Sequence, residues 1–316
     1  MYRLDMTVVL NVLSQMSRWT RVESTLAREA LAEFLGSFIL IMIGNGSIAE
    51  VVLSSGKANN FFSTNIGYGL AVMFGIYVAG GVSGGHINPA VSLAWCCLGR
   101  LQWRRLPTYV LAQYLGCLCG SAILFAIYHD ALDAFDGGFR VTDPIYGNAT
   151  AQIWASYPQP HVTWQNGLVD QIFATSFLMI GILAVCDEKN LRPPKGAIPA
   201  IIGLLVMVIG MSYGFNCGYP INPARDLSPR IFTAMAGWGS APFSHRDYNW
   251  FWVPVVGPHI GALLGALIYQ FFIGNNWGHS VTFREQVLIV ETMVPPEMDA
   301  GDFVKTATIT KETCNM

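Results

Sequence analysis

Two copies of the tripeptide Asn-Pro-Ala stand in the chain, at residues 88–90 and 222–224, one in each half. An asparagine side chain can cap a helix by accepting hydrogen bonds from its first backbone N–H groups. A proline suits the first helical position, where its missing N–H is not needed. Because the surrounding sequence is apolar, each copy predicts a helix that starts at membrane depth. The six residues are Asn88, Pro89, Ala90, Asn222, Pro223 and Ala224.

The backbone just before each motif is expected to line a pore. Non-helical backbone is tolerated in a bilayer only where it is buried in protein or lines a cavity. We expect carbonyl groups of these segments to form a ladder of hydrogen-bond acceptors, with apolar side chains on the opposite wall. One Asn-Pro-Ala is ordinary in soluble proteins, so the argument depends on the pair. The expected carbonyl residues are Gly84, Gly85, His86, Ile87, Gly218 and Pro220.

The composition indicates a membrane protein. Of 316 residues, 53% are apolar and 12% are charged, whereas soluble domains carry about 25% charged residues. The formal net charge is −2 and no basic patch with interleaved aromatics appears, so nucleic-acid binding is not expected. The seven cysteines have neither zinc-site spacing nor the pattern of a disulfide framework. Neither a metal nor another cofactor is expected.

Six segments are long and apolar enough to cross a bilayer, which takes about 20 residues. They run from about 30 to 53, 62 to 81, 106 to 128, 167 to 186, 197 to 213 and 250 to 273. Two shorter helices should begin at Asn88 and Asn222. Each belongs to a re-entrant segment, which enters and leaves the bilayer on the same side. The predicted fold is an all-α membrane protein with six transmembrane helices and two re-entrant half-helices. Residues 1–26 form an expected N-terminal arm, 27–274 a channel domain, and 275–316 a C-terminal tail.

The two halves of the chain form a predicted inverted repeat, at about residues 27–130 and 166–274. Each half contains three spans and one half-helix, and an odd number of spans reverses the orientation of the second half. The first span of each half carries a carboxylate, Glu33 or Asp170. We interpret both as acceptors that hold the loop before each half-helix. Proton transfer is the alternative interpretation, since a charge within a span marks a functional site.

Basic residues predict the orientation of the spans. Lys and Arg cluster in residues 18–28, 100–105 and 189–195, which fall on one side of a six-span protein. The connection between the third and fourth spans has only Arg140 against three aspartates. Both termini are therefore expected in the cytoplasm, with the protein in the plasma membrane. In the outer connection, Asn148 begins the sequon Asn-Ala-Thr and is a candidate for N-glycosylation.

Together these features resemble the aquaporin family, and specifically its aquaglyceroporin branch. The resemblance extends over about residues 27–274 and implies a homotetramer in a lipid bilayer. It also implies that the amides of Asn88 and Asn222 face the lumen, and that Arg225 lies near the outer mouth. Two helix N-termini would add partial positive charge at the midplane. A salt bridge to Asp226 is the alternative interpretation of Arg225.

The narrowest region of this family corresponds to Tyr68, Gly210, Tyr219 and Arg225, by their offsets from the motifs. Water-selective members typically have His where Gly210 stands, so the glycine is expected to leave room for glycerol. The two tyrosines would provide an apolar wall, although glycerol-conducting bacterial members have Trp in place of Tyr68. Further residues that distinguish the glycerol branch from the water channels agree: Tyr157, Asp226, Arg230, Pro254 and Val255.

The sequence thus predicts a passive channel for water and glycerol, with urea and other small neutral solutes as further candidates, that excludes protons and ions. A secondary transporter also uses inverted repeats and broken helices, but it needs coupling-ion ligands or a proton relay. Only Glu33 and Asp170 are available for that. An enzyme is not expected, because no Ser/His pair or paired acids stand at the midplane. His86, placed by the resemblance in the inner pore, is a candidate pH sensor.

Overall fold

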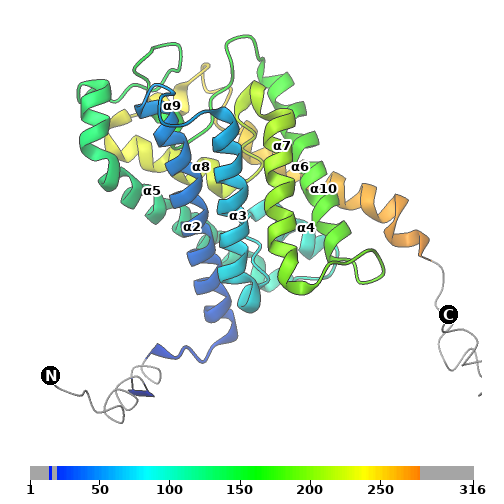
Figure 1. The fold of residues 1–316 in the computed structure, drawn as a ribbon. Helices are drawn as coiled ribbons and strands as arrows, with labels where there is room; N and C mark the ends of the chain where they lie inside the picture. Colours follow the sequence, from blue (N-terminus) through cyan, green and yellow to red (C-terminus); the bar gives the residue numbers. More distant parts are fainter. Residues whose placement is uncertain (1–13, 16–19, 278–316) are drawn as a thin grey trace, which may run out of the picture. The chain divides into compact units, whose positions relative to one another are not determined.

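The structure is a computed structural model that describes residues 14–15 and 20–277. The chain divides into a compact unit, Met1–Gly274, and a second unit, Asn275–Met316. Within the described residues all regular secondary structure is helical. The predicted fold of six spans and two half-helices is confirmed (Figure 1). The six long helices are α2 (Thr25–Leu53), α3 (Phe61–Ser83), α5 (Leu106–Asp136), α6 (Trp164–Cys186), α7 (Ile198–Cys217) and α10 (Val253–Phe272).

The two half-helices begin at the Asn-Pro-Ala motifs. Helix α4 (Pro89–Cys97) has Asn88 as its N-cap, and α8 (Pro223–Thr233) has Asn222. In Figure 1, α4 lies in the lower part of the view and α8 in the upper part. Each half-helix packs against the last span of both halves, α5 and α10. The half-helices are therefore held inside the bundle, as helix starts at membrane depth require.

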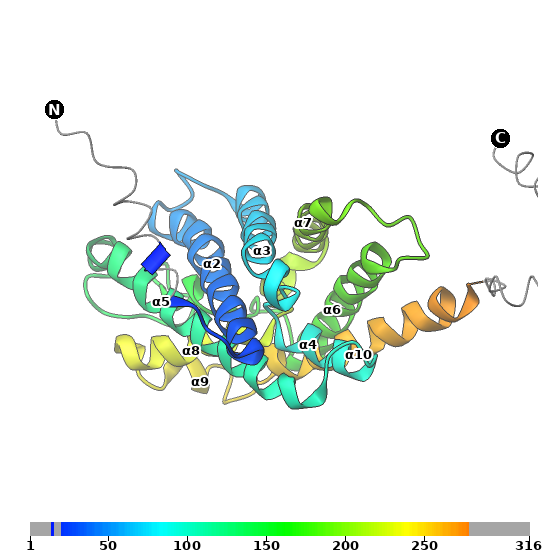
Figure 2. The ribbon, with the colours of Figure 1, turned by 90° about the horizontal axis from the view of Figure 1, so that it is seen from below.

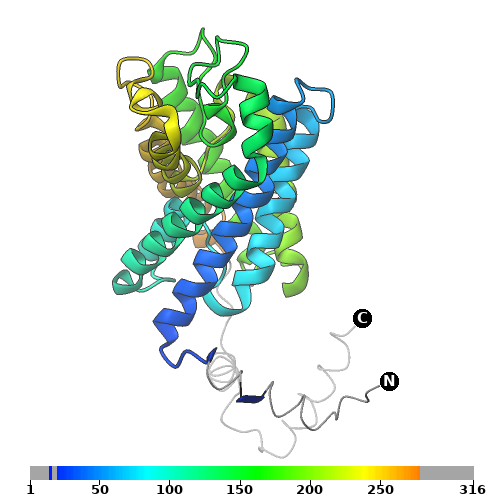
Figure 3. The same cartoon turned by 90° about the vertical axis from the view of Figure 1, so that its left-hand side faces the viewer.

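Contacts between the spans repeat in the two halves. Helix α2 packs on α3 and α5, just as α6 packs on α7 and α10, and α3 meets α7 where the halves join. Figure 2 shows the α2–α3 pair beside the α6–α7 pair, and Figure 3 shows α5 crossing α2 obliquely. Glycines permit the two close crossings. A Cβ atom on Gly116 would lie 2.2 Å from the Phe34 carbonyl oxygen, and one on Gly261 would lie 2.3 Å from that of Ile172.

Several helix ends differ from the sequence expectation. Helix α5 continues to Asp136 rather than ending near residue 128, because Leu132 is buried in a cluster with Trp154 and Trp238. Helix α7 continues past residue 213 to Cys217 and ends at Gly218, whose φ of 72° is left-handed. A further short helix, α9 (Ala241–Ser244), has no counterpart in the prediction.

Candidate functional site

The loop before α4 is held by the buried carboxylate of Glu33 on α2. One carboxylate oxygen accepts the backbone N–H of His86 at 2.8 Å, and the other accepts that of Ile87 at 2.7 Å. Gln113 Nε2 and the Ser83 hydroxyl complete the set at 2.8 and 2.6 Å. Ile87 has a φ of +43°, which is unfavourable for a β-branched residue. The four hydrogen bonds explain how the loop keeps that conformation, and they give Glu33 the structural role that we expected.

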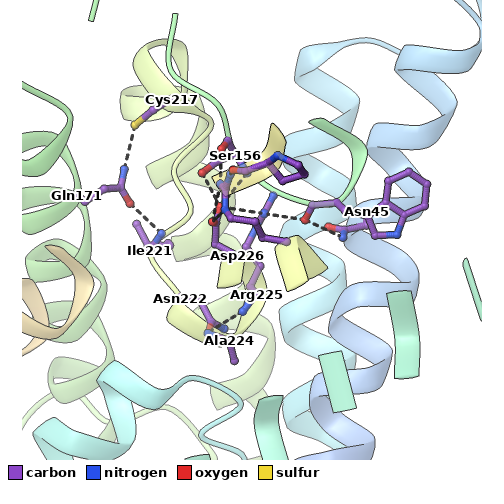
Figure 4. Close-up of polar contacts among 12 residues, drawn as sticks. Asn45, Ser156, Gln171, Cys217, Ile221, Asn222, Ala224, Arg225 and Asp226 are labelled. Carbon is purple, nitrogen blue, oxygen red and sulfur yellow. Dashed lines mark hydrogen bonds and ion pairs between the residues drawn. The ribbon is translucent and has the colours of Figure 1, made fainter. Parts of the chain in front are cut away.

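The loop before α8 is held differently, and the expectation for Asp170 needs correction. The Ile221 backbone N–H donates to Gln171 Oε1 at 3.0 Å (Figure 4). Asp170 instead accepts from Asn216 Nδ2 at 2.9 Å and contacts the Cys217 thiol at 3.4 Å, both at the end of α7. Gln171 is fully buried whereas Asp170 is only partly buried, so position 171 faces the bundle interior. The sequence prediction considered only charged residues within the spans, so it did not identify the neutral Gln171.

The two motif asparagines link the two loops. Asn88 Oδ1 accepts the Ala90 N–H at 2.9 Å, while its Nδ2 donates to the Ile221 carbonyl at 3.0 Å. Asn222 Oδ1 accepts the Ala224 N–H at 3.1 Å, while its Nδ2 donates to the Ile87 carbonyl at 2.8 Å. Each amide group has a second hydrogen on its nitrogen. Both asparagines line the same cavity.

Two cavities lie along the bundle and meet at three residues. The inner cavity has a volume of about 120 Å³ and is lined by both asparagines, most of the loop backbone and apolar span side chains. The outer cavity has a volume of about 290 Å³ and lies under the α5–α6 connection. The residues that line both are Tyr68, Tyr219 and Arg225. These three residues, all predicted from the sequence, therefore mark the boundary between the cavities.

The three boundary residues form a constriction with one charged and two aromatic sides. The Arg225 guanidinium carbon lies 4.9 Å from the centroid of the Tyr68 ring. The Tyr68 and Tyr219 rings are 6.1 Å apart at an interplanar angle of 75°. The fourth predicted position, Gly210, does not line either cavity. A Cβ atom there would lie 2.4 Å from Asn65 Oδ1 and 2.5 Å from Tyr219 Cζ, so the space that this glycine leaves is filled by the Asn65 amide and the Tyr219 ring.

The remaining predicted pore residues are distributed between the two cavities. The backbone of residues 84–87 and Pro220 borders the inner cavity, and Gly218 borders the outer one. His86 also lines the inner cavity, with its Nδ1 3.1 Å from the Ser92 hydroxyl. Its ring stacks on Trp95, with centroids 6.2 Å apart. In the α5–α6 connection, Asn148 is exposed.

An ion pair behind the constriction determines which of two arginines, Arg225 or Arg230, is directed at the constriction. Arg230 is fully buried, and its Nη2 donates to Asp226 Oδ1 at 2.8 Å and to the Ser156 carbonyl at 2.6 Å. The other Asp226 oxygen accepts the Ser156 backbone N–H at 2.7 Å. Arg225 Nη1 is 3.9 Å from Asp226 and 3.5 Å from the Trp154 carbonyl oxygen. Asp226 therefore pairs mainly with Arg230, and Arg225 remains directed at the constriction.

The predicted subfamily residues gather partly around this pair. The Arg230 guanidinium carbon lies 4.8 Å from the centroid of the Tyr157 ring. On another side, Tyr157 meets the His245 ring at 5.1 Å and an angle of 90°. Burial lowers the pKa of His245, so its imidazole is neutral at pH 7. The histidine therefore adds no positive charge near that of Arg230. Pro254 and Val255 lie in the first turn of α10.

A profile of the family described as "Major intrinsic protein" matches residues 19–269. This chain belongs to the major intrinsic protein family. Within it, the chain is 64% identical over 274 residues to Aquaporin-10 of Milnesium tardigradum, which covers 83% of this chain and 67% of that protein. It is 51% identical over 252 residues to Aquaporin-9 of Homo sapiens, covering 80% and 84%.

A solved structure agrees with these relatives. The X-ray structure of the aquaglyceroporin from Plasmodium falciparum superimposes with a TM-score of 0.70 at 29% sequence identity, covering 78% of this chain and 97% of that one. The sequence prediction of an aquaporin fold of the aquaglyceroporin branch is confirmed. This major intrinsic protein is a membrane channel.

Proposed function

We propose that water and glycerol cross this channel passively, through the constriction between its two cavities. The observation that carries the proposal is the set of residues that both cavities share: two tyrosine rings and one arginine. Glycerol has a carbon chain on one side and hydroxyl groups on the other. The rings of Tyr68 and Tyr219 suit the carbon chain, and the guanidinium of Arg225 suits the hydroxyls. Water needs only the polar side.

Below the constriction, the inner cavity repeats this two-sided character. Loop carbonyls accept hydrogen bonds from a solute, and the second N–H of Asn88 and of Asn222 donates one. The opposite wall consists of apolar side chains, among them Leu178 and Val206. A solute thus exchanges one set of hydrogen bonds for another as it moves, which keeps the barrier low. Urea and other small neutral solutes that satisfy both walls are further candidates.

Exclusion of protons and ions follows from charge. Helices α4 and α8 start at Asn88 and Asn222, so their positive ends meet beside the inner cavity. Arg225 adds a full positive charge at the constriction. Glu33 offers no proton relay, because both its oxygens are engaged with the loop. Its counterpart, Gln171, does not titrate, and the Asp170 carboxylate is engaged with Asn216 and Cys217 and lines neither cavity, which favours a channel over a proton-coupled transporter.

The setting of the channel is part of the proposal. The distribution of Lys and Arg favours cytoplasmic termini, and we place the protein in the plasma membrane as part of the same proposal. Asn148 would then face the cell exterior, where its exposure suits glycosylation. The family resemblance implies a homotetramer, which native mass spectrometry of the detergent-purified protein would test. Glycosidase treatment of the protein from a eukaryotic host, with Asn148→Gln as the control, would test the sequon.

Stopped-flow light scattering of proteoliposomes tests the function. We expect faster water and glycerol equilibration than in empty liposomes, with a low activation energy and no response to an imposed ion gradient. Counterflow and saturation at low glycerol concentration would instead indicate a secondary transporter. Glycerol flux equal to that of empty liposomes would remove the glycerol channel from consideration.

A further inference from the structure

One buried polar residue contacts the constriction from behind without lining either cavity. Asn45 lies within α2, is fully buried and is absent from both cavity linings. Its Oδ1 accepts a hydrogen bond from the Tyr68 hydroxyl, and its Nδ2 donates to the Trp154 carbonyl at 3.2 Å. A polar side chain within a spanning helix is unfavourable unless its groups are paired. Asn45 has both its donor and its acceptor sides paired.

The same Trp154 carbonyl joins Asn45 to the charged side of the constriction. Arg225 Nη1 approaches that carbonyl oxygen at 3.5 Å (Figure 4). Trp154 itself is fully buried, and its indole N–H donates to the Ser121 carbonyl at 3.3 Å. The carbonyl therefore has a fixed position. Through it, one side chain on α2 is connected to both Tyr68 and Arg225.

The neighbouring glycine makes this arrangement possible. A Cβ atom on Gly44 would lie 2.6 Å from Tyr68 Cε1, so only a glycine lets the Tyr68 ring lie directly against α2. Gly44 thus provides the surface on which the ring rests, and Asn45 fixes its hydroxyl. The ring face is left for the Arg225 guanidinium and for the carbon chain of a solute.

The two tyrosines of the constriction consequently differ. The Tyr68 hydroxyl is paired with Asn45, a residue that lines neither cavity. The Tyr219 hydroxyl is buried and has no hydrogen-bond partner within the part of the chain that the structure describes. Tyr68 therefore acts as an apolar wall, in spite of its hydroxyl, while only Tyr219 has a phenol oxygen left for another group.

We propose that Asn45 is a positioning residue that sets the spacing between Tyr68 and Arg225, and thereby the preference of the channel for glycerol relative to water. This inference rests on the proposed role of the constriction as the selectivity filter. Without Asn45, the Tyr68 hydroxyl loses its acceptor, and Arg225, whose guanidinium lies over the same ring, is the charged group that remains beside it. The ring then shifts toward Arg225 and reduces the space available to a three-carbon solute. Water, which is smaller, is affected less.

The test is a double-mutant cycle on proteoliposomes, with the glycerol-to-water permeability ratio as the readout. Loss of folded protein scales both permeabilities equally, so it leaves this ratio unchanged. We expect Asn45→Leu, which keeps the branching and the number of side-chain heavy atoms and removes both hydrogen bonds, to lower the ratio by about threefold to tenfold, as for one buried hydrogen bond. In a Tyr68→Phe background the same substitution should have a much smaller effect, because that background has no hydroxyl to release.

Tyr219→Phe is the matched control background, because it deletes a phenol hydroxyl that does not contact Asn45. There, Asn45→Leu should lower the ratio by the same factor as in the wild type. If Asn45→Leu does not reach the membrane, Asn45→Ala, which also removes both hydrogen bonds, replaces it in all three backgrounds. An unchanged ratio in the Asn45 variant that reaches the membrane overturns the inference, as does an equal effect of that variant in all three backgrounds. Wild-type glycerol flux at the level of empty liposomes would contradict the proposed function instead.

Discussion

The two halves of the channel reach the same backbone geometry with different chemistry. In the first half, the charge lies behind the loop, at Glu33, and the half-helix α4 contains no charged residue. In the second half, the side chain behind the loop is the neutral Gln171, and the charges lie on α8, at Arg225, Asp226 and Arg230. An inverted repeat therefore does not require identical supports. Because the charges of the second half lie on α8, that half has an arginine which solutes can contact.

The pairing on α8 explains why that arginine is free. Asp226 is engaged by Arg230 and by the Ser156 backbone, and Gln171 carries no charge to neutralise Arg225. Helix α8 thus carries two arginines against one aspartate, and Arg225, the more distant of the two from Asp226, lies at the constriction. The first half, with its two backbone amides on one carboxylate, mainly fixes the strained loop. The charged side of the constriction thus comes from the second half, while the first half holds its loop through Glu33 and contributes Tyr68 to the aromatic side.

Removing Glu33 should have the largest effect on stability. Glu33→Ala leaves the amides of His86 and Ile87 buried without acceptors, and each such group costs about 1–3 kcal/mol. We expect a large drop in the thermal denaturation midpoint of the detergent-purified protein and loss of both water and glycerol flux. Glu50→Ala, at an exposed position of the same helix, is the control. A denaturation midpoint like that of the control would refute the supporting role of Glu33.

Neutralising Asp226 should have an intermediate effect. Asp226→Asn removes the charged partner of the fully buried Arg230, and a hydrogen bond to a charged group contributes about 1.5–3 kcal/mol. The denaturation midpoint should fall, and the α5–α6 connection should become more accessible to protease, since Ser156 is held by the same carboxylate. Asp130→Asn, at an exposed position, serves for comparison. Unchanged proteolysis would show that the ion pair does not hold this connection.

Removing Gln171 should destabilise the protein less than removing Glu33. Gln171→Ala leaves a single loop amide, that of Ile221, without its acceptor, which corresponds to about 1–3 kcal/mol. Gln165→Ala, near the exposed start of α6, controls for the loss of an amide side chain. A midpoint shift as large as that of Glu33→Ala would mean that the two supports are equivalent after all.

The smallest expected effect is a pH dependence of stability that arises from His245, which lies beside Tyr157. The pKa of His245 is lowered in the folded protein, so its contribution to stability is fully present above its ordinary pKa of about 6.5. It is lost as the pH falls through the lower folded value, because the unfolded chain binds the proton more readily. In His245→Phe, the denaturation midpoint should change less between pH 7.5 and pH 5 than it does in the wild type. Identical pH profiles would exclude His245 as the cause.

Much of the fold and of the candidate site could be predicted from the sequence, because the signals for them are local. Apolar length predicts the spans, and Asn before Pro predicts where each half-helix starts, because both depend on few neighbouring residues. The choice between Asp170 and Gln171 depends on how α6 is rotated, which tertiary packing decides. The role of Asn45 depends on Tyr68 and Trp154, which are distant in sequence. A signal for it existed, since Asn45 is a polar residue within an uncharged apolar stretch.

The filter assignment is tested most directly by refilling the space beside Gly210. Because the Tyr219 ring shares that space with the Asn65 amide, we pair Gly210→His with Tyr219→Ala, so that the imidazole takes the place of the phenol. The measurement is the ratio of glycerol to water permeability in proteoliposomes of the double variant and of Tyr219→Ala alone. The account predicts that the added histidine lowers glycerol permeability by about tenfold or more while water permeability is retained, since narrowing by a polar group discriminates by size. Equal losses of water and glycerol permeability would contradict the assignment of the constriction as the filter.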